Sequence, residues 1–131
     1  MGNTVRSRIT RALVVDKEYK TKGSSLDKVV EELGLTRPRL AIFRAHNYGD
    51  AVEIINERGP SIVLIDQSVE DSYELCKLIK SNAQLGLTRT AYFVGSLKSI
   101  DKESPYVDKW YHKKQNPEDV ARDLSNIIDI V

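Results

Sequence analysis

The sequence has little cysteine, no long apolar run and almost no net charge. Its single cysteine, Cys76, excludes an internal disulfide and any metal site built from several cysteines. No apolar run approaches the roughly 20 residues that a membrane-spanning helix needs. Lys and Arg number 20 against 19 Asp and Glu, so a formal net charge of +1 provides no large field toward nucleic acid or anionic lipid. We therefore expect a cytoplasmic protein that binds neither nucleic acid nor membrane.

The 131 residues suffice for one domain with one core. Residues 1–10 are polar and basic, and we expect them to be frayed, with a single domain over 11–131. Cys76 is flanked by Leu75 and Ile79 on the apolar side of an expected helix. A free cysteine in such a place behaves as a small hydrophobic residue, so we expect it to be buried.

Apolar runs alternate with helical patterns along the chain. The run SIVLID, 61–66, is continuously apolar up to its last residue, which predicts a strand buried on both faces, as in a parallel sheet covered by helices. The segment 96–108 holds at best one short helix. The pattern predicts a doubly wound (βα)5 fold with a five-stranded parallel sheet and a short or missing fourth helix. The expected strands are 11–16, 39–45, 61–66, 90–95 and 107–111, and the expected helices run from Ser24 or Ser25 to Gly34, from Tyr48 to Arg58, over about 70–81, and from a cap at Asn116.

Polar residues follow several of these strands. Ligands of doubly wound folds bind beyond the carboxyl ends of the strands, so these residues are the candidates for a site. Two acids, a hydroxyl and a lysine are expected to converge there. In chain order the candidates are Asp16 and Lys17, Asp66, Gly95 and Ser96, and His112 and Lys113.

Three stretches in the right order resemble the receiver domain of bacterial two-component response regulators, the CheY-like family. They are LVVD at 13–16, PSIVLID at 60–66 and WYHKKQNPEDV at 110–120, and the resemblance extends over about 11–130. It implies a flavodoxin-like fold and a role in phosphorelay signal transduction. It implies that Asp66 is the phosphoacceptor position, that Asp16 and Asp66 form the acidic pocket, that Lys113 is the family's lysine, and that Gly95, Ser96 and Trp110 are the switch positions.

The chain departs from the family pattern at this site. The family has two adjacent acids after the first strand, and the second, usually a magnesium ligand, is Lys17 here. The loop after Asp66 is about two residues shorter than usual. The switch hydroxyl position falls on Gly95, with Ser96 one residue later. Lys114 stands where the family has proline.

The substitution at Lys17 changes the expected chemistry. Phosphoryl transfer to an aspartate needs a divalent cation, and Mg²⁺ prefers oxygen ligands. An ammonium removes one ligand and, at ~4 Å and an effective dielectric constant near 20, repels the ion by several kcal/mol. We expect Lys17 and Lys113 to pair with Asp16 and Asp66. The first hypothesis is therefore a degenerate or pseudo-receiver that has no catalytic residue, no metal and no enzymatic activity, and that acts by protein contact.

Two alternatives stay open. In one, Lys17 points to solvent or replaces the charge of the metal, and the chain is a stand-alone response regulator phosphorylated on Asp66, with Mg²⁺ held by Asp16 and Asp66 and a histidine kinase as partner. In the other, the chain is a flavodoxin-like ligand binder or enzyme of another kind. The candidate partners are a histidine kinase, an effector protein or a second copy bound through the fifth strand and the last helix. Trp110, expected near that surface, would anchor the interface.

Overall fold

Strands and helices alternate in the computed structural model, which describes residues 10–17, 25–82, 85 and 87–130. Apart from Thr10, the stretch expected to be frayed lies outside the described residues. No helix in the described ranges is long and apolar enough to span a membrane. The elements are β1 (Arg11–Val15), α1 (Ser25–Thr36), β2 (Ala41–Ala45), α2 (Tyr48–Arg58), β3 (Ile62–Asp66), α3 (Ser72–Ser81), β4 (Arg89–Val94), the 3-10 helix η3 (Leu97–Ser99), β5 (Lys109–His112) and α4 (Pro117–Ile130).

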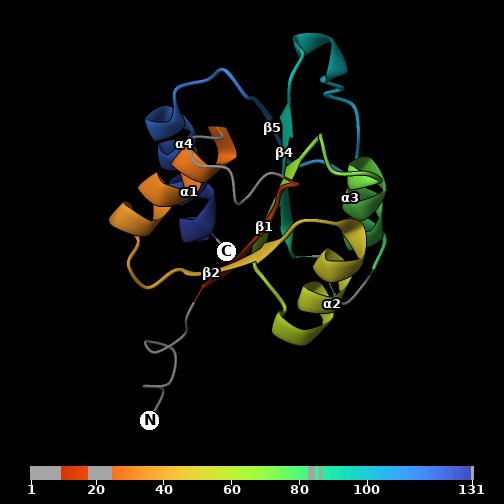
Figure 1. Ribbon diagram of the computed structural model, residues 1–131, viewed down its shortest axis with the longest axis horizontal. Helices are drawn as coiled ribbons and strands as arrows, with labels where there is room; N and C mark the ends of the chain where they lie inside the picture. Colours follow the sequence, from red (N-terminus) through yellow and green to blue (C-terminus); the bar gives the residue numbers. More distant parts are fainter. Residues whose placement is uncertain (1–9, 18–24, 83–84, 86, 131) are drawn as a thin grey trace.

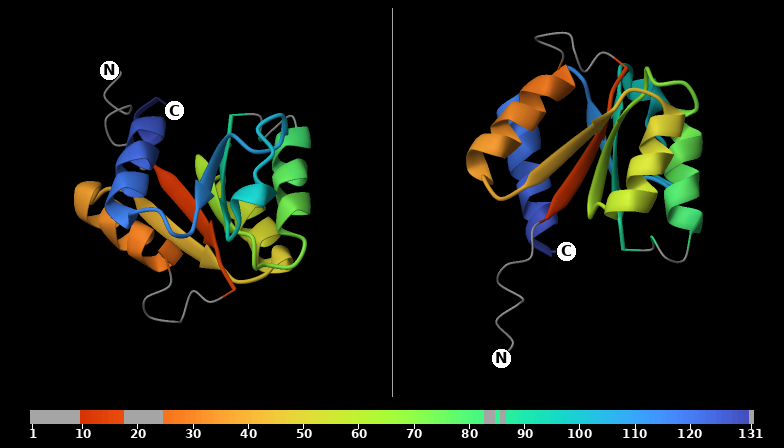
Figure 2. Two further views of the ribbon diagram at one scale, coloured as in Figure 1. Left: turned by 90° about the horizontal axis from the view of Figure 1, so that it is seen from above. Right: turned by 60° about the horizontal axis from the view of Figure 1, so that its bottom comes forward.

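The five described strands form one parallel sheet in the order β2-β1-β3-β4-β5. Helices α1 and α4 cover one face of the sheet, and α2 and α3 cover the other (Figures 1 and 2). This arrangement confirms the predicted doubly wound (βα)5 architecture. The topology leaves β2 and β5 at the edges of the sheet and β3 at its centre.

The central strand β3 explains why both faces must be covered, because all five of its residues are buried. Ile62 and Leu64 pack toward α1 and α4, whereas Val63 and Ile65 pack toward α2 and α3. Each such side chain contributes about 1.5–3 kcal/mol when it is fully buried. Cys76 belongs to the second cluster, and burial raises the pKa of its thiol to about 12. The thiol is therefore protonated at neutral pH, as expected for a core residue.

The boundaries of α2 follow from its caps. The side chain of Asn47 accepts the amide of Asp50 at 2.7 Å, and Gly59 ends the helix in the left-handed region at φ 55°. The predicted end of α1 at Gly34 is wrong, because the helix continues to Thr36. Pro38 explains the actual end, since proline disfavours a helical conformation in the residue before it. The end of α1 is therefore set by Pro38 and not by Gly34.

The connection between β4 and β5 contains one short 3-10 helix, η3, in place of a full fourth helix, which confirms the prediction for this segment. Strand β5 begins at Lys109, two residues later than expected. The side chain of Asp108 accounts for the later start, because it accepts the backbone amide of Thr90 at 2.8 Å at the position where the sequence predicts strand pairing.

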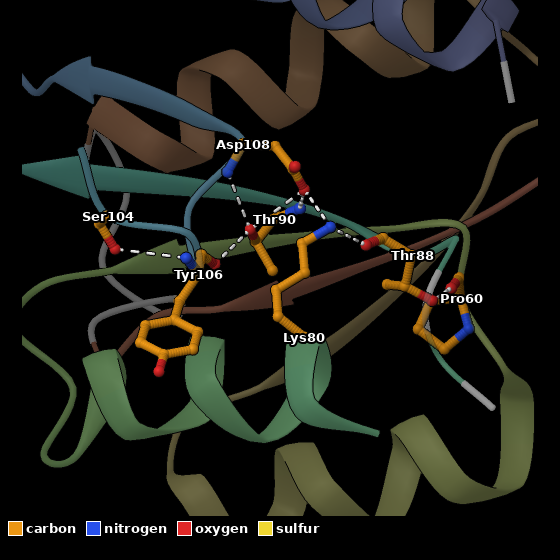
Figure 3. Close-up of polar contacts among 7 residues, drawn as sticks. All are labelled: Pro60, Lys80, Thr88, Thr90, Ser104, Tyr106 and Asp108. Atoms are coloured by element: carbon orange, nitrogen blue, oxygen red, sulfur yellow. Dashed lines mark hydrogen bonds and ion pairs between the residues drawn. The ribbon is translucent and has the colours of Figure 1, made fainter. Parts of the chain in front are cut away.

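A polar network anchors this connection at the amino ends of the strands (Figure 3). The ammonium of Lys80 lies 2.6 Å from Asp108 Oδ2 and donates to the carbonyl of Thr88 at 2.9 Å. The hydroxyl of Thr90 donates to the carbonyl of Tyr106 at 2.8 Å. These contacts join the end of α3 to the starts of β4 and β5. They hold the β4–β5 connection, which has no full helix of its own.

We predict that Asp108→Ala lowers the free energy of unfolding by about 2–3 kcal/mol, because it removes the ion-pair partner of Lys80, which keeps only the Thr88 carbonyl, and the side-chain acceptor of the Thr90 amide. The side chains of Lys80 and Asp108 are 14% and 24% exposed. Urea denaturation followed by circular dichroism measures the change. The matched control is Arg122→Ala, which breaks an ion pair to Asp119 whose side chains are 72% and 66% exposed and should cost less than about 0.5 kcal/mol. Equal losses in the two variants would contradict a stabilising role for the network.

Candidate functional site at the carboxyl ends of the strands

Two buried carboxylates lie side by side at the carboxyl ends of β1 and β3. Asp16 follows β1 and is 2% exposed, and Asp66 ends β3 and is 5% exposed. Strand register places them next to each other, because Val15 pairs with Ile65 one position earlier. The amide of Asp16 donates to the carbonyl of Ala45 at 3.0 Å, which fixes the chain as it leaves β1.

Asp66 is held by two donors from different parts of the chain. The ammonium of Lys113 lies 2.7 Å from Asp66 Oδ1, and the backbone amide of Ser68 donates to the same oxygen at 2.8 Å. The amide of Lys113 donates to the carbonyl of Val94, which continues the β4–β5 ladder and aims the side chain back over the end of β4. A charge-assisted contact of this length compensates the burial of a carboxylate.

The structure places Lys17 elsewhere than the sequence predicts. The expected position of its ammonium is between Asp16 and Asp66, but the residue is exposed and forms no ion pair with any carboxylate that the structure describes. It lines an open groove of about 480 Å³ together with the start of α2 and the β3–α3 loop. The physical reason is that Lys17 lies in the turn after β1, where its ammonium keeps its hydration and avoids the cost of burial. Lys113 is therefore the lysine that contacts Asp66.

The three expected switch positions do not share one environment. Gly95 and Ser96 are exposed, and the hydroxyl of Ser96 accepts the amide of Lys98 at 3.2 Å as a cap of η3. Trp110 is half-buried, and its ring packs edge-on against Tyr92 with centroids 5.4 Å apart. The indole thus faces the α2 and α3 side of the sheet and takes part in core packing.

No protein-family model and no curated protein match this chain. Solved structures do match it. A signal receiver domain of a DNA-binding response regulator from Colwellia psychrerythraea 34H superposes with a TM-score of 0.76 at 17% identity, covering 92% of this chain and 98% of that one. The response regulator receiver domain protein (CheY-like) from Methanospirillum hungatei JF-1 superposes with a TM-score of 0.70 at 19% identity, covering 93% of this chain and 95% of that one. A two-component response regulator from Legionella pneumophila superposes with a TM-score of 0.74 at 16% identity, covering 95% of this chain and 100% of that one.

This chain has the receiver fold. At these identities the likeness is one of fold, and it agrees with the fold implied by the three sequence motifs. The residues at the carboxyl ends of the strands then decide how far the chemistry of receivers extends to this chain.

The residues of this receiver fold do not fit a magnesium ion well. Among the residues that the structure describes, no group of three or more His, Cys, Asp or Glu side chains could hold a metal. The two carboxylates of the site are Asp16 and Asp66, and one oxygen of Asp66 already accepts two hydrogen bonds. Lys17 stands at the sequence position that would supply a third carboxylate. The described side chains thus offer fewer free carboxylate oxygens than a receiver with two adjacent acids after its first strand would offer.

Two features of the β3–α3 loop have little or no signal in the sequence. The side chain of Gln67 accepts the amide of Gly95 at 3.1 Å, which links this loop to the end of β4. Asp71, which precedes α3, has a φ of 61° and makes no side-chain capping bond. The signal for Gln67 is only its place directly after Asp66, and the signal for Asp71 is only that aspartate adopts the left-handed region more readily than most residues.

We predict that Asp71→Gly raises the free energy of unfolding by about 0.5–1 kcal/mol, because glycine adopts the left-handed region without the steric cost that a Cβ brings. Asp71→Ala is the matched variant, since it retains the Cβ and lacks the polar side chain that eases this conformation, and it should destabilise by about 0.5–1 kcal/mol. Urea denaturation of both variants measures the difference. A loss of stability in Asp71→Gly would show that the carboxylate itself makes a stabilising contact.

Proposed function

We propose that this chain is a degenerate receiver domain of two-component-type signal transduction that acts by protein contact with little or no Mg²⁺-dependent phosphorylation. The receiver fold supports signalling through protein partners, because its structural neighbours are response regulators. The observation that carries the finer proposal is the donor set of the site. Asp16 and Asp66 have no third carboxylate beside them in the sequence, because Lys17 occupies that position.

The exposed position of Lys17 changes the reason for this proposal. Solvent screens an exposed ammonium, so its repulsion of a cation is weaker than that of an ammonium held between the carboxylates. The missing ligand then matters more than the added charge. Mg²⁺ has a strong preference for oxygen ligands in an octahedral arrangement, and a site with fewer carboxylates binds it more weakly.

The second candidate function is a receiver phosphorylated on Asp66. The observation that favours it is the contact between Asp66 and Lys113 at 2.7 Å, which leaves a cation beside the carboxylate to offset incoming negative charge. The exposed Lys17 also meets a condition of this alternative, because its ammonium forms no ion pair with a carboxylate that the structure describes. Neither candidate function requires the chain to turn over a substrate.

The experiment that separates the two functions incubates the chain with acetyl phosphate and Mg²⁺ and measures its intact mass. We predict no added phosphoryl group on the wild-type chain. Lys17→Asp restores the paired acids and should tighten Mg²⁺ binding by about tenfold or more, with phosphoryl uptake at Asp66. Lys17→Ala removes the charge without adding a ligand and should remain inactive.

Each other outcome has a defined meaning. Uptake by the wild-type chain that Asp66→Asn abolishes would establish the second function and reject the first. Uptake by Lys17→Ala at the level of Lys17→Asp would show that charge repulsion, and not the missing ligand, silences the site. Mg²⁺ titration monitored by Trp110 fluorescence reports binding independently of the chemical reaction.

We further propose that the protein partner is a second copy bound at β5 and α4. Strand β5 lies at the sheet edge, and its half-buried Trp110, on the α2 and α3 side of the sheet, is the kind of side chain that anchors interfaces. On the opposite face of the same strand, Tyr111 donates to Asp123 of α4 at 2.6 Å, so the sheet edge and α4 adjoin in the proposed surface. Burial and this contact raise the pKa of Tyr111, so the phenol stays protonated as the donor at neutral pH.

We predict that Trp110→Ala weakens self-association by about tenfold or more, as expected for truncation of an interface anchor. Sedimentation equilibrium measures the association, and urea denaturation measures the stability that is lost with the Tyr92 contact. Tyr92→Leu is the control, because it removes the same ring contact from a buried position, together with the Ser72 hydrogen bond and the Tyr73 ring contact of that phenol. Equal loss of association in both variants, or a monomeric wild-type chain, would contradict the proposed dimer surface.

A further inference from the structure

The loop after β3 contacts the loop after β4 through Gln67. The backbone amide of Gln67 donates to the carbonyl of Phe93 at 2.9 Å and extends the β3–β4 ladder by one step. Its side-chain oxygen then accepts the amide of Gly95 at 3.1 Å, a contact between residues that are 28 positions apart. The side chain therefore spans the ends of two neighbouring strands beside the candidate site.

The loop that Gln67 holds is the one that leads into η3. Ser96 stabilises the turn from within, because its hydroxyl accepts the amide of Lys98 at 3.2 Å and its carbonyl accepts the amide of Ser99 at 3.0 Å. The amide of Gly95, at the entrance to this turn, is held from outside by Gln67. The carboxamide of Gln67 is thus a side-chain contact between the loop that contains Asp66 and the start of this turn.

Three donors near the candidate site are engaged by two neighbouring side chains. Asp66 accepts the Ser68 amide and the Lys113 ammonium, and Gln67 accepts the Gly95 amide. A phosphoryl group on Asp66 would offer oxygens to donors of this kind. The carboxamide of Gln67 already supplies such an oxygen, and because it is neutral it needs no metal ion to offset its charge.

We propose that Gln67 is a positioning residue that holds the loop after β4 in one arrangement, whatever the chemical state of Asp66. This inference rests on the proposed function, since it explains how a receiver domain without phosphorylation keeps a fixed surface for its partner. The segment from Gly95 to Ser99 is then a constant part of the surface.

The test measures amide exchange with water by NMR in four variants. Gln67→Met keeps the length of the side chain and removes the carboxamide oxygen, and Gln67→Glu keeps an oxygen at the same reach. Asp66→Asn changes the neighbouring carboxylate. Gln115→Met is the matched control, because the Gln115 side chain accepts the amide of His112 at 2.7 Å in the loop after β5.

We predict that Gln67→Met accelerates exchange of the Gly95 amide about five- to tenfold, the effect of losing one ordinary hydrogen bond. Gln67→Glu should restore slow exchange, and Asp66→Asn should change it by less than about twofold. Gln115→Met should accelerate exchange at His112 and leave Gly95 unchanged. A general loss of structure in Gln67→Met would accelerate exchange of both the Gly95 and the His112 amides. In that case Gln67→Glu, rather than Gln67→Met, is compared with Asp66→Asn.

The proposal is overturned if Asp66→Asn releases the Gly95 amide as much as Gln67→Met does, or if Gln67→Met leaves its exchange unchanged. These outcomes are separate from a failure of the proposed function. Phosphoryl uptake by Asp66 in the mass measurement would reject the degenerate receiver, whereas the exchange rates alone decide whether Gln67 positions the loop.

Discussion

The pairing of a buried Asp66 with Lys113 is the interaction on which the rest of the candidate site depends. A carboxylate that is removed from water needs donors, and Asp66 receives one from its own loop and one from the loop after β5. Lys113 reaches Asp66 across β4 because β3, β4 and β5 end at nearly the same level. The pair is therefore a consequence of the strand order, and it ties β3 to β5 across β4. It is a contact that breaks if β5 shifts along the sheet.

The position of β5 depends in turn on contacts at the opposite end of the sheet. A connection that contains only η3 has little helical surface to bury, so side chains must hold it. Asp108 does this at the start of β5 by joining Lys80 of α3 to Thr90 of β4. Gln67 holds the other end of the same connection at Gly95. The shortened segment is thus held by polar contacts near both of its ends, and Tyr106 within it packs edge-on against Tyr73 of α3.

The sequence predicted the buried frame of the molecule well and the directions of exposed side chains poorly. The run that becomes β3 favours a strand covered on both faces, and Asn47 and Gly59 specify the two ends of α2 through local hydrogen bonds and a positive φ. These signals depend on neighbouring residues or on sequence periodicity, so they predict structure without knowledge of the tertiary fold. The direction of Lys17 depends on the turn that follows β1 and on the cost of burying an ammonium, neither of which its neighbours reveal. The contact between Gln67 and Gly95 joins distant residues, and it needs the sheet register before it can be inferred.

The exposed Lys17 separates two ways in which a receiver fold can lose its chemistry. In the first, a cation takes the place of the metal and neutralises the acids from within. In the second, a ligand is lost while the substituted side chain stays in water. Within the described residues, Lys113 is the cation that pairs with Asp66, and Lys17 lines a groove, which favours the second for the proposed degenerate receiver. Under that condition Asp66 keeps a partner of opposite charge that does not depend on any ion. The site then keeps its shape without a metal. A partner that does not recognise a phosphoryl group needs a surface whose shape stays the same.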